Sequence, residues 1–406
     1  QIHSDLVRVA REEDAGKLRW DERPYDADAL ITNVPNLPLF AYGTDCCMIT
    51  VYDPTSRSIA AMPIGGRYRV IDVLLSNMVH SDITNVGLIT QRNYHSLMDH
   101  LESGKAWDLN RKRDGLFILP PYVTRSNPGG YAGMLDAIRS NLGYVRRASQ
   151  RYALISGSST VFNTTFDDMM KKHMESGADI TILYNVPGEG ELFSDADRTY
   201  LKLDENNRVV DIEVSPHLHS YPNVSMDVYL MDKALLTYLV EISAAHYRTD
   251  FVRDVLINQL SELKVYAYKY EGYVSRIESI YSYYRLNMDL LNEEIRTPLL
   301  YRPNPVYTKV KDEVPARYEA GAKAVNSLVA DGCIIEGTVE NSVLFRGVRV
   351  GKGAVVKDCI LMQSVEVQDG AQLSHVISDK NAFIKRDRRI VGQESYPVVI
   401  EKNAVI

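Results

Sequence analysis

Along residues 46–291, apolar positions recur with two different periods. Residues 70–83 (VIDVLLSNMVHSDI) carry the period of an amphipathic helix, and residues 85–90 (NVGLIT) form a short apolar run typical of a buried strand. Further helix patterns cover residues 131–147 and 166–177, and further strand patterns cover residues 151–157 and 178–186. This alternation predicts a mainly parallel sheet covered by helices, a fold that places ligands at the carboxyl ends of its strands.

Two residues refine the helix predicted at 166–177. Gly177 suits the position just after a helix, where a left-handed backbone is favoured. His173 is expected on the exposed face of this helix. It is not a candidate metal ligand, because no second ligand is spaced near it.

From about residue 325 the helix period disappears, and aliphatic residues recur every six positions with small residues and glycines between them. The recurring positions are Leu328 and Ile334; Leu344, Val350 and Val356; and Leu361, Val367 and Leu373. An antiparallel sheet with many turns would alternate by two. The six-residue repeat therefore favours a parallel β-helix, whose aliphatic residues stack inside a three-sided coil. The flat faces and unpaired end of such a coil often stack on another subunit.

The chain has 406 residues, more than one ordinary core accommodates. Its patterns divide it into four parts. These are an extension of unknown role (1–45), a sheet-and-helix domain (46–291), a linker (292–324) and the β-helix (325–406).

The composition narrows the class of protein further. A net charge of −7 argues against nucleic acid or an anionic membrane as a partner. No apolar run is long enough to span a membrane, and residues 1–30 lack the apolar region of a signal peptide. The cysteines show neither a CxxC nor a Cys/His ligand spacing; they are Cys46, Cys47, Cys333 and Cys359. We therefore expect a cytoplasmic protein with reduced thiols.

Five segments resemble, in the same order, segments of the ADP-glucose pyrophosphorylase (glucose-1-phosphate adenylyltransferase) family. They are PIGGRYRVIDVLLSNMVHSDI (63–83), GLITQRNYHSLMDHL (87–101), ILPPYVTRSNPGGYAGMLDAI (118–138), VSMDVYLMD (224–232) and YSYYRLNMDLL (281–291). The resemblance covers about residues 46–400. It implies an α/β protein, with a nucleotidyltransferase-like (Rossmann-like), mainly parallel sheet domain followed by a left-handed parallel β-helix of hexapeptide repeats.

The reaction of that family joins a sugar phosphate to the α-phosphorus of ATP and expels pyrophosphate. Its chemistry needs carboxylates to hold Mg²⁺, lysines near the phosphates, and a glycine-rich loop whose N–H groups approach the triphosphate. In this chain the family loop GGxGTRLxPLT is replaced by YDPTSRSIAAMP (52–63).

The residues at the positions of the family's catalytic groups also differ from the family pattern. Ile59 and Ser215 stand at the lysine positions, and Ser159 and Arg276 stand at the positions of the Mg²⁺-binding aspartates. An arginine cannot bind Mg²⁺ and would occupy the place of the cation. The resemblance therefore implies the non-catalytic (GlgD-type) subunit of the family, with no catalytic residues and no metal or other cofactor of its own. Mg²⁺ is expected only in a catalytic partner.

Other positions keep more of the family pattern. The resemblance implies vestigial substrate contacts, with purely structural roles as the alternative, at Tyr131, Gly133, Asp136, Ser225 and Asp227.

The resemblance also implies a pocket for a phosphorylated-sugar or nucleotide effector. Its basic residues would be Arg57, Arg67 and Arg69, with Lys380 from the last coils of the β-helix. Arginine presents planar donors that suit phosphate. The alternative is a solvated basic loop, because the run continues after Lys380 with Lys385, Arg386, Arg388 and Arg389.

Three functions are compatible with this sequence. The first is a regulatory subunit that pairs with a catalytic (GlgC-type) homologue in a heterotetramer making ADP-glucose for glycogen synthesis. The second is an active sugar-phosphate nucleotidyltransferase with Glu278 and Asp167 as replacement metal ligands. The third is a stand-alone sugar-phosphate sensor. The loss of carboxylates, lysines and glycine loop together favours the first, because a single such contact contributes about 3 kcal/mol to transition-state stabilisation.

Overall fold

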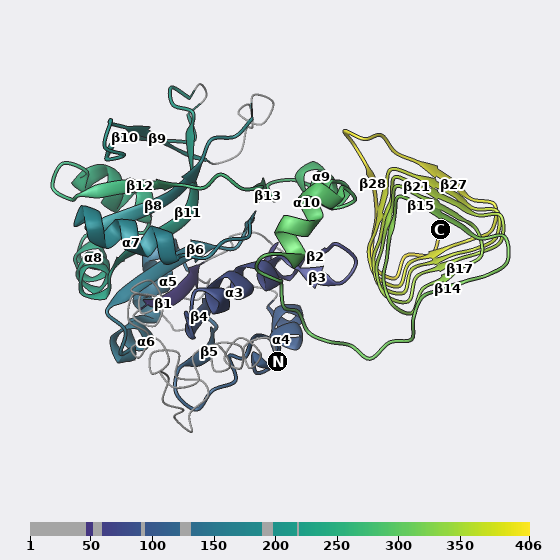
Figure 1. Cartoon of the computed structure of the whole chain (residues 1–406), viewed down its shortest axis with the longest axis horizontal. Coiled ribbons are helices and arrows are strands. Elements are labelled where there is room, and N and C mark those ends of the chain that lie inside the picture. Colours follow the sequence, from purple (N-terminus) through teal and green to yellow (C-terminus); the bar gives the residue numbers. More distant parts are fainter. Residues whose placement is uncertain (1–45, 52–58, 91–93, 122–130, 189–197, 217–218) are drawn as a thin grey trace, which may run out of the picture.

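The computed structural model describes residues 46–51, 59–90, 94–121, 131–188, 198–216 and 219–406. The extension 1–45 and Arg57 lie outside the described residues. Within these ranges no helix combines the length and apolar character needed to cross a membrane. Figure 1 shows a sheet covered by helices beside a separate coil, with helical segments between them.

The larger domain is built on a nine-stranded mixed sheet. Its parallel part has the order β6-β1-β4-β5, formed by Tyr152–Gly157, Cys46–Val51, Asn85–Ile89 and Gly115–Leu119. The remaining strands are β11 (Asn223–Asp232), β8 (Ile180–Asn185), β12 (Val265–Lys269), β9 (Thr199–Leu203) and β10 (Val209–Val214). β11 runs antiparallel to β6, β8 and β9, and β12 is parallel to β8. The strands predicted from apolar runs are confirmed.

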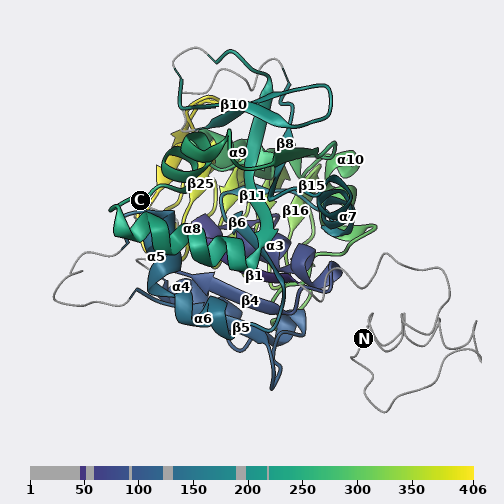
Figure 2. The same ribbon diagram turned by 90° about the vertical axis from the view of Figure 1, so that its left-hand side faces the viewer.

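Helices cover both faces of this sheet. One face carries α5 (Met134–Ser140), α6 (Leu142–Arg147) and α8 (Lys233–Ala245), which lies across the sheet in Figure 2. The other carries α3 (Val70–His80), α4 (His95–Leu101) and α7 (Asp167–Ser176). Successive strand residues serve opposite cores: Ile155 packs in the first and Leu154 in the second. The predicted helices are confirmed, except that the pattern at 131–147 divides at Asn141.

The connection to the coil is mostly helical. α9 (Ile280–Asp289) begins at Ser279, whose hydroxyl accepts a hydrogen bond from the Ser282 N–H at 3.1 Å. α10 (Glu293–Arg296) and the π-helical turn η5 (Thr297–Tyr301) follow.

The C-terminal part is the left-handed parallel β-helix, made of three five-stranded parallel sheets. The first sheet contains β14 (Arg317–Tyr318), β17 (Ile334–Ile335), β20 (Arg349–Val350), β23 (Glu366–Val367) and β26 (Phe383–Ile384). The second contains β15 (Lys323–Val325), β18 (Thr338–Glu340), β21 (Val355–Lys357), β24 (Gln372–Ser374) and β27 (Arg389–Val391). The third contains β16 (Leu328–Val329), β19 (Val343–Leu344), β22 (Ile360–Leu361), β25 (Val376–Ser378) and β28 (Val398–Ile400).

The structure corrects the predicted start and phase of this coil. Its first strand, β14, lies inside the linker predicted at 292–324. Leu328 and Ile334 are not interior positions, because Val329 pairs with the buried Leu344, and Ile335 with the buried Val350. The other predicted positions, from Leu344 to Leu373, lie in the coil's core.

The third sheet of the coil packs on the larger domain, and we call it the docked face. Its buried side chains include Phe345, Ile360 and Ile377, which share one core with Tyr283 and Leu286 of α9. The Tyr284 hydroxyl adds a hydrogen bond to the backbone carbonyl of Asp358 at 2.8 Å. Burial of apolar side chains on both sides therefore fixes the coil to the domain.

Candidate functional site

The two positions of the missing metal ligands are neighbours in space. β7 (Thr160–Val161) pairs antiparallel with β13 (Ser275–Arg276), in a register that sets Arg276 opposite Thr160. The Ile277 N–H donates to the backbone carbonyl of Ser159 at 2.9 Å. The short ladder therefore brings Ser159 and Arg276 to one place beyond the carboxyl end of β6.

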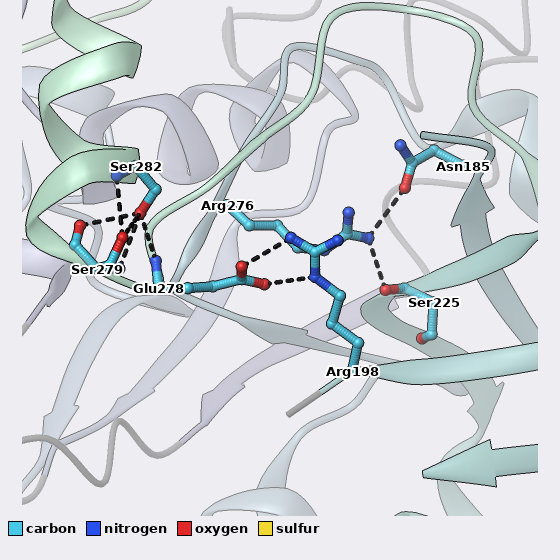
Figure 3. Close-up of polar contacts among 7 residues, drawn as sticks. All are labelled: Asn185, Arg198, Ser225, Arg276, Glu278, Ser279 and Ser282. Atoms are coloured by element: carbon cyan, nitrogen blue, oxygen red, sulfur yellow. Dashed lines mark hydrogen bonds and ion pairs between the residues drawn. The ribbon is translucent and has the colours of Figure 1, made fainter. Parts of the chain in front are cut away.

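Arg276 donates two hydrogen bonds at this place (Figure 3). Its Nη2 donates to Oδ1 of Asn185 at 2.9 Å and to the backbone carbonyl of Ser225 at 2.8 Å. Both acceptor residues are buried, with exposed fractions of 7% and 3%. Hydrogen bonds from a charged donor to buried acceptors are among the stronger ones. The guanidinium is thus anchored by two buried acceptors, and its place at a family carboxylate position stays a prediction.

A second arginine, Arg198, forms an ion pair in the same region. Arg198 donates from Nε and Nη2 to the two carboxylate oxygens of Glu278, at 2.8 and 2.7 Å (Figure 3). This fork-to-fork pair is largely shielded, with side chains 9% and 20% exposed. Glu278 therefore has its oxygens engaged by a cation, and the structure does not favour it as a replacement metal ligand.

Ser225 and Asp227 lie at an irregularity of β11. The pairing of β11 with β8 shifts between Ser225 and Val228, and Asp227 has a left-handed backbone with φ of 56°. The Asp227 N–H donates to Oγ of Ser225 at 3.1 Å, and the Tyr229 hydroxyl donates to Asp227 at 3.3 Å. Burial raises the pKa of the Asp227 carboxyl, while Arg276 opposes this rise. These contacts give both residues a structural role; their contact with a sugar stays a prediction.

This set of residues does not fit a Mg²⁺ ion. Mg²⁺ requires an octahedral set of oxygen ligands, and here the guanidinium of Arg276 already binds the oxygens of Asn185 and Ser225. In the part of the chain that the structure describes, no three His, Cys, Asp or Glu side chains are grouped to hold a metal. Asp167, the other proposed replacement ligand, neighbours Thr165 and Asp82 instead of Glu278. The use of Glu278 and Asp167 as replacement metal ligands stays a prediction.

Ile59 and Ser215, which the resemblance places at two lysine positions, both make contacts within the fold. Ile59, in the turn η2 (Ile59–Ala61), packs partly buried against the core shared with the docked face. Ser215 follows β10 with φ of 51°, and its N–H donates to the backbone carbonyl of Arg198 at 2.8 Å. Neither side chain offers a positive charge to a phosphate.

Three predicted substrate contacts, Tyr131, Gly133 and Asp136, are each held by contacts within the fold. Tyr131 is buried, and its hydroxyl donates to the carbonyl of Pro120 at 3.2 Å. Asp136 accepts from the Ala132 N–H at 3.0 Å. A Cβ on Gly133 would stand 2.4 Å from the carbonyl oxygen of Thr249, so only glycine fits there. Packing explains these three residues, and ligand binding by them stays a prediction.

Three of the predicted effector residues, Arg67, Arg69 and Lys380, line one pocket, which we call the cationic pocket. It lies between the hairpin of β2 (Pro63–Ile64) and β3 (Tyr68–Arg69) and one corner of the coil. Its basic lining residues are Arg67, Arg69, Lys311, Arg346 and Lys380. Arg346 and Lys380 stand in one column of the corner, two coils apart, with Gln363 between them.

The cationic pocket concentrates like charges. Burial lowers the pKa of Lys380, and the nearby Arg69 lowers it further. Burial and then Arg346 lower the pKa of Lys311 in the same way. The Nε of Arg346 is buried and has no hydrogen-bond partner among the described residues. Like charges gathered with an unused donor favour an anion as ligand.

One carboxylate balances part of this charge. Asp72 is fully buried at the start of α3, where it accepts from the Arg69 N–H at 2.8 Å. Its other oxygen lies 2.5 Å from Nε2 of His100, which also lines the pocket. Asp72 thus orients the hairpin and His100, and the remaining basic groups face the pocket.

Sequence reasoning missed Arg346 and Lys311. Arg346 had a usable signal, because it occupies the same corner position as Lys380 in an earlier coil. Lys311 lies in the linker, and no repeat marks it. Lys385, which follows Lys380 in sequence, is exposed and lies outside the pocket's lining.

The expected exposure of His173 is wrong. Only 3% of it is exposed, because α7 packs this face on the sheet. Its Nδ1 lies 2.7 Å from the hydroxyl of Thr181, and its ring meets Tyr152 edge-on. Burial lowers the pKa of His173 to about 4. It is therefore a neutral core histidine.

Comparisons with known proteins agree with this architecture. The family model "Nucleotidyl transferase" matches residues 54–293, and the model "GlmU-like, C-terminal hexapeptide" matches residues 313–396. Together they define a nucleotidyl transferase domain followed by a hexapeptide β-helix.

Individual relatives narrow this class. The chain is 37% identical over 350 residues to "Glycogen biosynthesis protein GlgD" of Bacillus subtilis, covering 86% of this chain and 91% of that protein. It is 34% identical over 351 residues to "Glucose-1-phosphate adenylyltransferase" of Bacillus mycoides, covering 85% and 88%. The enzyme of the same name from Geobacillus stearothermophilus is 35% identical over 308 residues, covering 75% and 78%. The chain belongs to the glucose-1-phosphate adenylyltransferase family, which includes GlgD.

A third family model, "Multi-copper polyphenol oxidoreductase laccase", matches residues 1–85. Its span overlaps the nucleotidyl transferase match, and the described residues of the overlap form β2, β3 and α3 of the sheet domain. The described residues of this stretch do not group the ligands that copper needs.

Proposed function

We propose that this chain is the regulatory, non-catalytic subunit of a glucose-1-phosphate adenylyltransferase. It assembles in the cytoplasm with a catalytic homologue in a heterotetramer that makes ADP-glucose from ATP and glucose 1-phosphate for glycogen synthesis. The anchored guanidinium of Arg276 carries this proposal, because it fills the metal position with a positive charge. The high identity to a protein named GlgD supports it.

The chain acts in this proposal by binding one conformation of its partner better than another. The open first coil supplies a surface for assembly, because exposed apolar side chains such as Val314 (71%) and Tyr318 (52%) gather there. The partner supplies Mg²⁺ and the catalytic lysines.

The test compares this chain alone, the catalytic homologue alone, and the mixture. Pyrophosphate release is measured with Mg²⁺, ATP and glucose 1-phosphate, and assembly is measured by light scattering. We expect no release from this chain alone, one larger species in the mixture, and a higher rate or altered effector response. Turnover by this chain alone of about 10 per second would instead support an active transferase. Two independent species in the mixture would support a stand-alone sensor.

The cationic pocket is proposed to bind a phosphorylated sugar or a nucleotide that regulates the assembly. The gathered charges and the unpaired Nε of Arg346, considered among the described residues, support this role. Lys380→Gln should weaken binding of a hexose phosphate at least about tenfold, because a buried charge-assisted contact is lost. Lys385→Gln makes the same change on an exposed residue and is the matched control. Equal affinity of both variants would exclude the pocket as the effector site.

A further inference from the structure

A second cavity lies along the other edge of the docked face, between α9 and a different corner of the coil. Side chains of α9 form one wall, including Tyr281, Arg285 and Asp289. The corner residues form the facing wall. We call this space the corner cavity.

The facing wall is a column of four residues, one from each successive coil. Asn326, Asn341, Asp358 and His375 each follow the last residue of a strand in the second sheet. All four have left-handed backbones, with φ of 43°, 44°, 52° and 52°. This conformation explains the choice of Asn and Asp. It also points four hydrogen-bonding side chains into one cavity.

The charges of the corner cavity differ in kind from those of the cationic pocket. Arg285 and His375 are its basic groups, and Asp289, Asp358 and Glu394 are its acidic groups. The two signs are interleaved, so neither a phosphate nor a metal cation is favoured. The Asn326 amide donates to Oδ1 of Asn341 at 2.8 Å, and Asp289 accepts from the Tyr273 hydroxyl at 2.8 Å. The planar side chains of this cavity have further donor and acceptor capacity beyond these bonds.

Aromatic surface accompanies these polar groups. Tyr281 lines the cavity and is 42% exposed. Tyr396 is 81% exposed and lies in the same turn as Glu394. A tyrosine ring offers an apolar face with a polar tip, which matches the C–H face and hydroxyl edge of a pyranose.

We infer that the corner cavity binds a neutral oligosaccharide through its Asn, Asp, His and Arg side chains, with Tyr281 stacking on a sugar ring. Vicinal hydroxyls both donate and accept, so a planar side chain can bond two of them at once. The inference that the ligand is a neutral oligosaccharide depends only on the side chains that line the corner cavity. The choice of an α-1,4-linked glucan rests on the proposed function, because such a chain is the downstream product of ADP-glucose. Binding of this glucan to the corner cavity would make the assembly sensitive to the glucan concentration.

The test uses the full chain and maltoheptaose, a neutral α-1,4-linked glucan, in a calorimetric titration supported by saturation-transfer NMR. Tyr281→Ala removes the ring at an exposed helix position where alanine is well tolerated. Arg285→Gln removes the charge and keeps an amide. We expect each variant to weaken binding about tenfold. Tyr238→Ala, also at an exposed position of a helix, is the matched control and should leave affinity unchanged.

Several outcomes would overturn the inference. These are no binding at millimolar maltoheptaose, equal binding by Tyr281→Ala and the parent chain, or equal binding of the β-linked cellohexaose. Displacement of maltoheptaose by glucose 1-phosphate alone would also overturn it, because the site would then be phosphate-selective. If Tyr281→Ala instead weakens assembly with the catalytic homologue and no glucan binds, the cavity is a subunit contact. Assembly and activation that persist without glucan binding leave the proposed function intact.

Discussion

Replacing Arg276 should reveal whether it has become a structural residue. Its two hydrogen bonds join β13 to Asn185 at the end of β8 and to the irregular part of β11. Arg276→Gln leaves buried acceptors poorly satisfied and should lower the free energy of unfolding by about 3 kcal/mol. Arg276→Lys keeps the charge but loses the planar fork, so its loss should be about 1–2 kcal/mol.

Arg276→Asp should be the most damaging change of this series. It removes the cation that opposes the raised pKa of Asp227 and adds a second carboxylate beside it. We expect a loss of about 4 kcal/mol, near that of breaking a buried ion pair. Adding Ser159→Asp should then create a site whose stability depends on Mg²⁺, with a gain of about 2.7 kcal/mol at a concentration a hundredfold above its dissociation constant.

The assay is urea unfolding of each variant, followed by fluorescence and circular dichroism, in EDTA and in Mg²⁺. Equal slopes of free energy against urea are required for comparison. A change in Arg276→Gln below about 0.5 kcal/mol would refute a structural role, since that is the range of an unimportant surface residue. If Mg²⁺ does not change the free energy of unfolding of the double variant, aspartates at these two positions are not metal ligands.

Three further predictions follow from contacts described above. Because burial lowers the pKa of His173 to about 4, the fold has its full stability from this group above a pH of about 6.5, and about 3 kcal/mol is lost as the pH falls from about 6.5 to about 4. The free energy of unfolding of His173→Gln should therefore depend less on pH in this range. Gly133→Ala forces a Cβ to 2.4 Å from a carbonyl oxygen and should cost about 1–3 kcal/mol, whereas Gly143→Ala, with open space around it, should be neutral or stabilising in thermal melts. The double change Ser159→Asp with Arg276→Asp should recover little pyrophosphate release, and Ile59→Lys with Ser215→Lys should add more, because lysines compensate transition-state charge; a full recovery from the carboxylates alone would contradict this.

The sequence predicted correctly those features that depend on the spacing of residues close together in the chain. The left-handed Gly177 that ends α7 and the repeating interior of the coil follow from neighbours in the chain. Prediction from the sequence failed for residues whose surroundings come from distant parts of the chain. His173 reads as a surface residue because its flanking residues are charged, but the helix face that meets the sheet includes it. Arg346 escaped notice because its distance from Lys380 is set by the coil, and the anchoring of Arg276 depends on acceptors 91 and 51 residues away.

The docked face has a mechanical consequence. One sheet of a stiff coil rests on the larger domain, with the cationic pocket along one edge and the corner cavity along the other. A small tilt of the coil about this contact would open one space as it narrows the other. Ligands of the two spaces would then oppose each other, by the same factor in both directions. The angle between the coil and the larger domain would then depend on whether the anion or the glucan is bound. Any subunit stacked on the open end of the coil would sense this angle.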